Sequence, residues 1–275
     1  MCNANGLMEP FIDNSHLGRM LQDRMHSFSP LYWLNTYGED THYNFMKKLS
    51  GQVDARLLYK AWAWTCFLKE NGFESRNGTV CELLPGPSLV VPLALCFLNG
   101  SERLVQFDKR PVEVQNLFPK LIIEKKSFDI WTDNIDIASF DLIVGNHIID
   151  DLMLDLFDGR DNSYRSFYND KFERKNAWKS IVANNLVEKF VTQIANLIEG
   201  YTRRMNPGSC FILRHYPSSM GLSAMDSGQV SFELNVLSYL LARIPGSELR
   251  EDTHYALPEG AKYGKSFWLY KAPAR

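Results

Sequence analysis

The sequence has no long block of charge of one sign. It carries 30 Lys and Arg residues against 32 Asp and Glu residues, for a net charge of -2. Proteins that bind nucleic acids concentrate basic side chains on one surface, because contacts to phosphates dominate their affinity. The even mixture of charges therefore argues against nucleic acid as a partner.

Cysteines are few and scattered along the chain. The five cysteines contain no CxxC pair and no spacing that suits a zinc site. We therefore expect reduced thiols, as in cytoplasmic proteins, and no bound metal.

Long apolar segments are also missing. Residues 1–15 lack the basic start and the apolar stretch of a secretory signal. The longest uninterrupted apolar run, Leu89 to Leu98, is far shorter than the roughly 20 residues that span a membrane. No internal repeat or low-complexity tract is present either. We expect a cytoplasmic protein without a membrane segment.

From residue 78 onward, short apolar runs alternate with helical patterns, which is typical of an α/β protein with a parallel sheet. We expect helices at 52–70, where Asn71-Gly72 ends the pattern, from near Ser88, at 177–203 and at 232–243. The predicted strands cover residues 80–83, 103–107, 121–128, 142–144 and 210–213.

The end of the chain departs from this alternation. Two further strand patterns, 253–257 and 266–270, are separated only by PEGAKYGK, which is too short for a crossover helix. We therefore expect a mostly parallel sheet of seven strands that closes with a C-terminal antiparallel hairpin. Residues 1–77 are expected to form an N-terminal helical cap, and residues 78–275 the sheet domain.

Polar residues follow the first two predicted strands. Glu82 and a loop with Gly86 and Ser88 come after the first strand, and Asp108 comes after the second, 22 positions beyond Gly86. An acidic residue about 20 positions after the glycine suits the vicinal hydroxyls of a ribose. A dinucleotide normally requires GxGxxG, of which one glycine remains here. A nucleoside ligand without a diphosphate is the better match.

From about residue 27 to its end, the sequence resembles the class I S-adenosylmethionine-dependent methyltransferases. It looks most like the small-molecule amine N-methyltransferases of the phenylethanolamine and nicotinamide type. The resemblance implies a Rossmann-like fold and S-adenosylmethionine as cofactor. In that family a segment FxPxxYLxxY closes over the cofactor. Its pattern is matched here by Phe28, Pro30, Trp33, Leu34 and Tyr37, with Tyr32 beside the position where Trp33 replaces the tyrosine.

The cofactor end of the family's site also has counterparts. Its DIGSGPT loop corresponds to Glu82 through Ser88, which keeps the acid, Gly86 and a hydroxyl but departs at Leu84 and Pro85. The resemblance implies that Asp108 binds the ribose. In KSFDIW it implies that Asp129 binds the adenine amino group and that Ile130 packs on the ring.

The substrate end matches through FDLIVGNHIIDDL, residues 140–152. The resemblance places Asp150 at the substrate amine, and we expect Asn146 to contact the cofactor. His147 is a candidate proton acceptor. A second acid of the family, after the fifth strand, is missing, because Ser218 stands at that position.

Each assignment has a structural alternative. Glu82 and Asp108 could be solvated charges at strand ends, Asp129 a turn cap and Asp150 a helix cap. His147 could be a half-buried imidazole that takes no part in chemistry.

The favoured function is methyl transfer from S-adenosylmethionine to a small molecule, at an amine or other nitrogen. Three alternatives stay open. The first is methyl transfer to oxygen with His147 as base. The second is transfer of the aminocarboxypropyl arm, suggested by Leu84-Pro85, and the third is a non-catalytic partner subunit on the same scaffold.

Overall fold

The computed structural model describes residues 55–73, 78–86, 88–98, 103–109, 121–157, 171–215, 227–251 and 266–274. These residues divide into two compact units, one up to Asp133 and the other from Asn134 onward. The described strands form a mixed sheet of seven. The expected mostly parallel sheet with a C-terminal antiparallel hairpin is confirmed.

The first unit contains three parallel strands in the order β3-β2-β1. They cover Thr79–Leu83 (β1), Arg103–Asp108 (β2) and Ile122–Ser127 (β3), close to the predicted positions. Val80 to Leu83 are all buried, as is usual for a parallel strand covered on both faces. The carboxyl ends of all three strands therefore lie at one edge.

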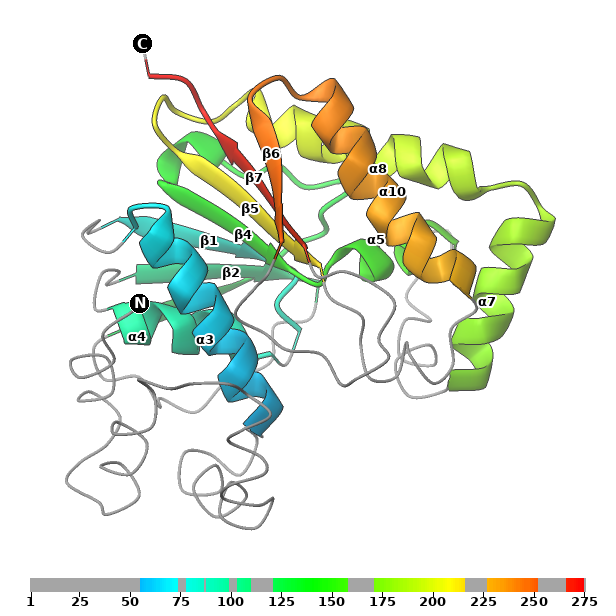
Figure 1. Ribbon diagram of the computed structural model, residues 1–275, viewed down its shortest axis with the longest axis horizontal. Coiled ribbons are helices and arrows are strands. Elements are labelled where there is room, and N and C mark those ends of the chain that lie inside the picture. Colours follow the sequence, from blue (N-terminus) through cyan, green and yellow to red (C-terminus); the bar gives the residue numbers. More distant parts are fainter. Residues whose placement is uncertain are drawn as a thin grey trace. The chain divides into compact units, whose positions relative to one another are not determined.

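Two helices belong to this unit, α3 (Ala55–Glu70) and α4 (Val90–Leu98), and they pack against each other (Figure 1). The predicted stop of α3 is confirmed. Gly72 takes φ +80°, and the amides of Gly72 and Phe73 donate to the carbonyls of Lys69 and Leu68. This bond pattern is a Schellman motif, which a glycine in the left-handed conformation completes without strain. Most of the predicted N-terminal cap lies outside the described residues, so the division at residue 77 stays a prediction.

The second unit contains four strands in the order β4-β5-β7-β6. Strands β4 (Leu142–Asn146) and β5 (Cys210–His215) are parallel, and β7 (Ser266–Lys271) runs antiparallel to both β5 and β6 (Ser247–Glu251). The sequence predicted the second strand of the hairpin correctly. Its first strand is β6, whereas the expected segment 253–257 lies outside the described residues.

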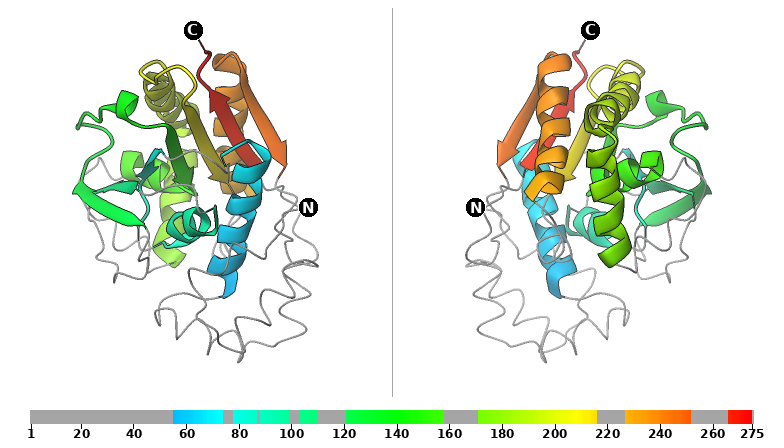
Figure 2. Two further views of the ribbon diagram at one scale, coloured as in Figure 1. Left: turned by 90° about the vertical axis from the view of Figure 1, so that its left-hand side faces the viewer. Right: turned by 90° about the vertical axis from the view of Figure 1, so that its right-hand side faces the viewer.

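The helices of this unit are α5 (Ile149–Phe157), α7 (Lys171–Ala183), α8 (Val187–Thr202) and α10 (Ser227–Arg243), with a short 3₁₀ turn, η1 (Ile137–Ser139). α8 packs against α10 and α5, and α10 also contacts β6 (Figures 1 and 2).

One long helix over 177–203 was predicted, and this was wrong. Asn185 takes φ +55°, and the amides of Asn185 and Leu186 donate to the carbonyls of Val182 and Ile181. The same Schellman motif that ends α3 thus ends α7, with asparagine in place of glycine. Ile181 and Phe190 are both buried, so the helical pattern of apolar residues continues across the break. The sequence pattern therefore does not show where α7 ends and α8 begins.

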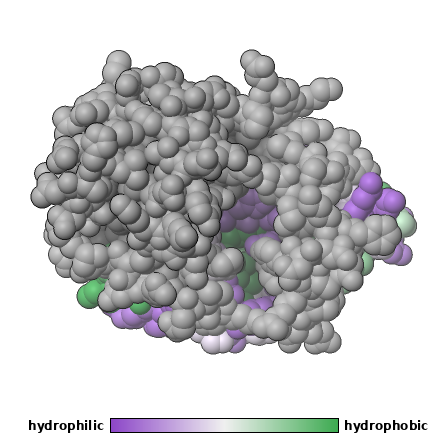
Figure 3. All heavy atoms as spheres, turned by 90° about the horizontal axis from the view of Figure 1, so that it is seen from below, coloured by the Kyte–Doolittle hydropathy of each residue, from purple (hydrophilic) through white to green (hydrophobic). Residues whose placement is uncertain are grey.

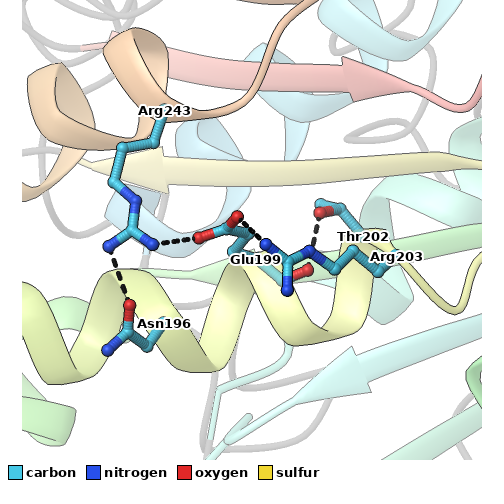
Figure 4. A network of polar contacts seen from close by, with 5 residues as sticks. All are labelled: Asn196, Glu199, Thr202, Arg203 and Arg243. Atoms are coloured by element: carbon cyan, nitrogen blue, oxygen red, sulfur yellow. Dashed lines mark hydrogen bonds and ion pairs between the residues drawn. The ribbon is translucent and has the colours of Figure 1, made fainter.

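A polar network joins α8 to α10 (Figure 4). The Glu199 carboxylate accepts hydrogen bonds from the guanidinium groups of Arg203 and Arg243, one on each oxygen. A second nitrogen of Arg243, Nη1, donates to Asn196 Oδ1 at 2.7 Å. The network stabilises the packing of the two helices.

Few large apolar side chains are exposed among the described residues. They are Ile122, Val182, Tyr239, Leu241 and Leu249. On the face seen in Figure 3, the described residues that are visible include both polar and apolar ones. Cys66 and Cys81 in the first unit and Cys210 in the second are buried thiols. In the described part of the chain, no helix has the length and hydropathy that crossing a membrane requires.

Candidate functional site

Glu82 lies near the carboxyl end of β1 and is completely buried. Its Oε2 accepts a hydrogen bond of 2.7 Å from Gln106 Nε2, whereas its Oε1 is buried with no hydrogen-bond partner among the described residues. Burial raises the pKa of Glu82 from an ordinary 4.5 to about 8, and the nearby charge of Asp108 acts in the same direction. The hydrogen bond from Gln106 and the charge of Lys125 oppose this rise.

The loop after β1 has a left-handed backbone at two positions. Leu84 takes φ +49° and Gly86 φ +54°. Glycine adopts this conformation freely, but for leucine it costs about 1–2 kcal/mol. The Leu84 amide donates to the Phe107 carbonyl at 2.8 Å, which fixes the start of the loop beside β2. A strained residue persists only where its surroundings hold it, so Leu84 marks a closely constrained turn.

Asp108 holds the other end of this loop. It is the last residue of β2, and its Oδ2 accepts a hydrogen bond of 3.0 Å from the Gly86 amide. The loop and the acid 22 positions after Gly86, which the sequence pattern assigns to one binding site, are therefore in direct contact. The Asp108 carboxylate is part of this turn, and Glu82 lies just before the turn, in β1.

Ser88 lies just before α4. Its amide donates to the Pro85 carbonyl at 3.1 Å, and its Oγ accepts from the Val90 amide at 3.3 Å. The hydroxyl thus satisfies one of the amides at the helix start that lack a helical partner. This is a capping role; a contact of Ser88 with a cofactor stays a prediction.

Asp129 follows β3 and forms a turn. Its Oδ1 accepts from the Trp131 amide at 2.9 Å, and its Oδ2 lies 3.5 Å from Lys109 Nζ. Its own amide donates to Asp133 Oδ2 at 2.8 Å. The turn-capping alternative therefore describes Asp129 in this structure. Ile130 is buried, at 3% exposure. The adenine-binding roles of both residues stay predictions.

In the second unit, Asn146 ends β4 and His147 follows it with φ +62°. The His147 amide donates to the Arg214 carbonyl at 2.8 Å, which ties this turn to the end of β5. His147 Nδ1 lies 2.9 Å from Asp150 Oδ1, and the Asp150 side chain is 3% exposed. The two candidate catalytic residues therefore form one pair.

An ionised Asp150 accepts a hydrogen bond from the Nδ1–H tautomer of His147. That tautomer leaves Nε2 as the basic atom of the ring. Asp150 lies in the first turn of α5, where a negative charge is favoured by the helix dipole. A carboxylate that orients an imidazole is the arrangement of a general base.

Sequence reasoning missed two polar side chains beside Glu82 and a third residue, Arg214, whose backbone carbonyl contacts the turn at His147. Gln106 and Lys125 lie beside Glu82, and Arg214 is 1% exposed, with its guanidinium 5.2 Å from the centre of the Phe267 ring. Gln106 is the single polar residue in the apolar run of β2, at the position that pairs with Glu82. This position in the register was the available signal. The predicted cofactor-binding residues Tyr32 and Tyr37 lie outside the described residues.

No family model matches the sequence, and no curated protein matches it. Similar solved structures include the N-methyltransferase NodS from Bradyrhizobium japonicum WM9, at 12% identity and a TM-score of 0.43, covering 78% of this chain and 97% of that one. Another is the plantazolicin methyltransferase BpumL in complex with SAH, at 11% identity and a TM-score of 0.45, covering 94% and 100% of the two chains. At such identities and TM-scores the similarities support no conclusion about activity, so the functional inference has to come from this chain's own residues.

Proposed function

We propose that the chain binds S-adenosylmethionine at the carboxyl ends of β1, β2 and β3 and transfers its methyl group to a small-molecule acceptor, at an amine or other nitrogen. One observation carries the proposal. The Gly86 amide donates to Asp108 Oδ2 at 3.0 Å, so a constrained loop and a carboxylate meet at the end of neighbouring strands. Ligands of open α/β sheets bind at this edge.

The residues present fit such a cofactor. Carboxylates accept hydrogen bonds, and the ribose hydroxyls and the ammonium group of the cofactor donate them. Asp108 would hold the ribose, and the buried Oε1 of Glu82, which has no donor among the described residues, could accept a hydrogen bond from the ligand. Asp129 and Ile130 would hold the adenine, and Tyr32 and Tyr37 would cover the cofactor.

When bound, the cofactor would supply a methyl group already activated by a positively charged sulfur. The chain then has to position the acceptor and take up its proton, since orientation alone lowers such a barrier by several kcal/mol. His147 Nε2 would accept that proton, and Asp150 would hold the ring and stabilise the imidazolium. Asn146 and the turn at His147 would position this pair.

Calorimetric titration with the demethylated product, S-adenosylhomocysteine, tests the cofactor assignment. Asp108→Ala removes a charged acceptor and should weaken binding roughly 10- to 100-fold, the usual worth of a hydrogen bond to a charged group. Asp136→Ala is the matched control, because Asp136 is an exposed acid that makes no side-chain cap at η1. No detectable affinity in the unaltered chain would remove the proposal.

The His147–Asp150 pair favours a second candidate, methyl transfer to an oxygen atom, because a hydroxyl must lose its proton to become a good nucleophile. For such an acceptor, His147→Ala should lower turnover by about 10²- to 10⁴-fold. Near-normal turnover would exclude a histidine base.

Mass spectrometry of the product separates methyl transfer from aminocarboxypropyl transfer. A melting temperature that no cofactor raises, together with tight co-purification of another chain, would instead favour a non-catalytic partner subunit.

A further inference from the structure

A row of polar side chains crosses the three strands of the first unit. Glu82 on β1 pairs in register with Gln106 on β2, and Gln106 pairs with Lys125 on β3. Register partners in a sheet point to the same face, so these side chains form one line across the strands. Two of its members are buried, with Glu82 at 0% and Gln106 at 4% exposure.

The row leaves one oxygen atom unsatisfied. Gln106 Nε2 donates to Glu82 Oε2 at 2.7 Å, while Glu82 Oε1 is buried and has no donor among the described residues. Native structures rarely leave a buried carboxylate oxygen without a donor, because the lost hydration is not replaced. The site therefore disfavours the charged form until a donor or a positive charge arrives.

The charged groups around Glu82 act in both directions. Burial raises the pKa of Glu82 to about 8, and Asp108 adds to the rise. The amide of Gln106 and the charge of Lys125 lower it. At neutral pH the carboxyl therefore holds its proton, and a bound cation would shift the balance toward the carboxylate.

We propose that Glu82 exchanges a proton for a cation: when the ammonium group of the cofactor's amino-acid end binds at Oε1, the Glu82 O–H bond breaks and its proton passes to solvent. The carboxylate then balances the charge of the ammonium. Gln106 is a positioning residue that keeps Oε2 occupied and so presents Oε1 to the ligand. This inference rests on the proposed cofactor.

The exchange predicts a pH dependence of affinity. Between about pH 6 and 7.5, one proton leaves for each ligand bound, so the dissociation constant falls nearly tenfold for each unit of pH. Above about pH 8 the affinity stops rising, because Glu82 is then already ionised before the ligand binds. The ammonium group of the ligand, which lies beside the ligand's own carboxylate, loses its proton only at higher pH, so the affinity should level off above about pH 8 and fall again once that group is neutral.

Titration calorimetry of the full chain with S-adenosylhomocysteine at pH 6.5, in two buffers of different ionisation enthalpy, counts the protons. We expect close to one proton released by the unaltered chain. Glu82→Gln, which resembles the protonated side chain in shape, should release close to none while binding more weakly. Repeating the titration from pH 6 to 9 gives the position of the affinity rise.

Two further variants test whether the neighbouring polar side chains control the ionisation of Glu82. Gln106→Leu and Lys125→Met each remove a group that favours the ionised Glu82, so the affinity rise should move to higher pH. Lys126→Met is the matched control, because Lys126 points to the opposite face of β3, over the Phe107 ring at 5.7 Å. Its pH profile should stay unchanged.

The outcomes distinguish this inference from the proposed function. Binding without proton release, or equal release from Glu82→Gln, overturns the exchange and leaves the cofactor assignment standing. An unchanged pH profile in both Gln106→Leu and Lys125→Met overturns it as well, even if Glu82→Gln does not fold. Absence of any binding removes the cofactor assignment and the exchange together.

Discussion

Two buried or partly buried glutamates in this chain are held in opposite ways. On α8, Glu199 has a guanidinium on each carboxylate oxygen, from Arg203 and Arg243 (Figure 4). On β1, Glu82 accepts a hydrogen bond from one neutral amide, and its second oxygen is buried with no donor in the part of the chain that the structure describes. The Glu199 side chain keeps 15% of its surface exposed, whereas Glu82 has none.

These surroundings imply that the charged Glu199 carboxylate stabilises the fold, whereas the charged form of Glu82 destabilises it. A carboxylate with two guanidinium partners is stabilised in its charged form, and its removal deprives both cations of their negatively charged partner. A buried carboxyl without a cation is unfavourable in its charged form. Such groups are retained most often where a ligand completes them, which is why they mark candidate sites.

Replacement of Glu82 should have the largest effect on stability. The pKa of Glu82 is about 8 in the folded chain against an ordinary 4.5, so the folded state binds the proton more tightly than the unfolded state. The resulting penalty is absent below about pH 4.5, grows as the pH rises and is complete above about pH 8. Glu82→Gln, which cannot ionise, should therefore raise the free energy of unfolding by on the order of 4 kcal/mol at pH 8.5.

Urea unfolding at pH 8.5 and at pH 5 measures this gain. At pH 5 the variant and the unaltered chain should differ by less than about 1 kcal/mol, since little of the penalty has developed. A gain of equal size at both pH values would mean that packing rather than ionisation is responsible. A lower free energy of unfolding for Glu82→Gln at pH 8.5 would mean that Glu82, like Glu199, stabilises the fold.

Glu199→Ala should act in the opposite direction and less strongly. It leaves Arg203 and Arg243 without their acceptor, and we expect a loss of about 1–2 kcal/mol in the free energy of unfolding. The loss should shrink in high salt, because screening weakens the original pairs. Glu248→Ala is the control, since its pair with Arg250 is exposed and should be worth little. Equal losses from the two variants would contradict a special role for the α8–α10 network.

The smallest expected effect on stability concerns a residue with a left-handed backbone conformation outside the candidate site. Asn185 ends α7 with φ +55°, where glycine has no steric cost. Asn185→Gly should therefore stabilise the chain by a few tenths to about 1 kcal/mol, visible as a higher melting temperature. A lower melting temperature would show that the Asn185 side chain contributes more than its backbone strain costs.

Much of this fold could be predicted from the sequence because the central strands are continuous apolar runs. The predictions for β1, β4 and β5 depended on segments such as Leu142 to Val144, all of them buried. β6 carries one large apolar residue, Leu249, which is itself 36% exposed, so its pattern was too weak to recognise. The break between α7 and α8 was hidden because a capping asparagine leaves the apolar stripe intact.

The sequence indicated those residues of the candidate site that directly follow predicted strands. Glu82, Gly86 and Asp108 follow strands in the expected order, and the contact between Gly86 and Asp108 is present. The sequence could not show that His147 and Asp150 share a hydrogen bond, because His147 needs a left-handed backbone that histidine seldom adopts. It also could not show the role of Gln106, which depends on strand register.

The buried cysteines give a way to follow each unit without altering the chain. Cys81 on β1 and Cys210 on β5 lie in central strands of different units, and burial raises the pKa of Cys81 well above its ordinary range. Only thiolates react with alkylating reagents, so each thiol reacts when its strand opens. Mass mapping of the alkylated peptides over time would therefore report two separate opening rates, and ligand protection confined to Cys81 would place the bound molecule on the first unit.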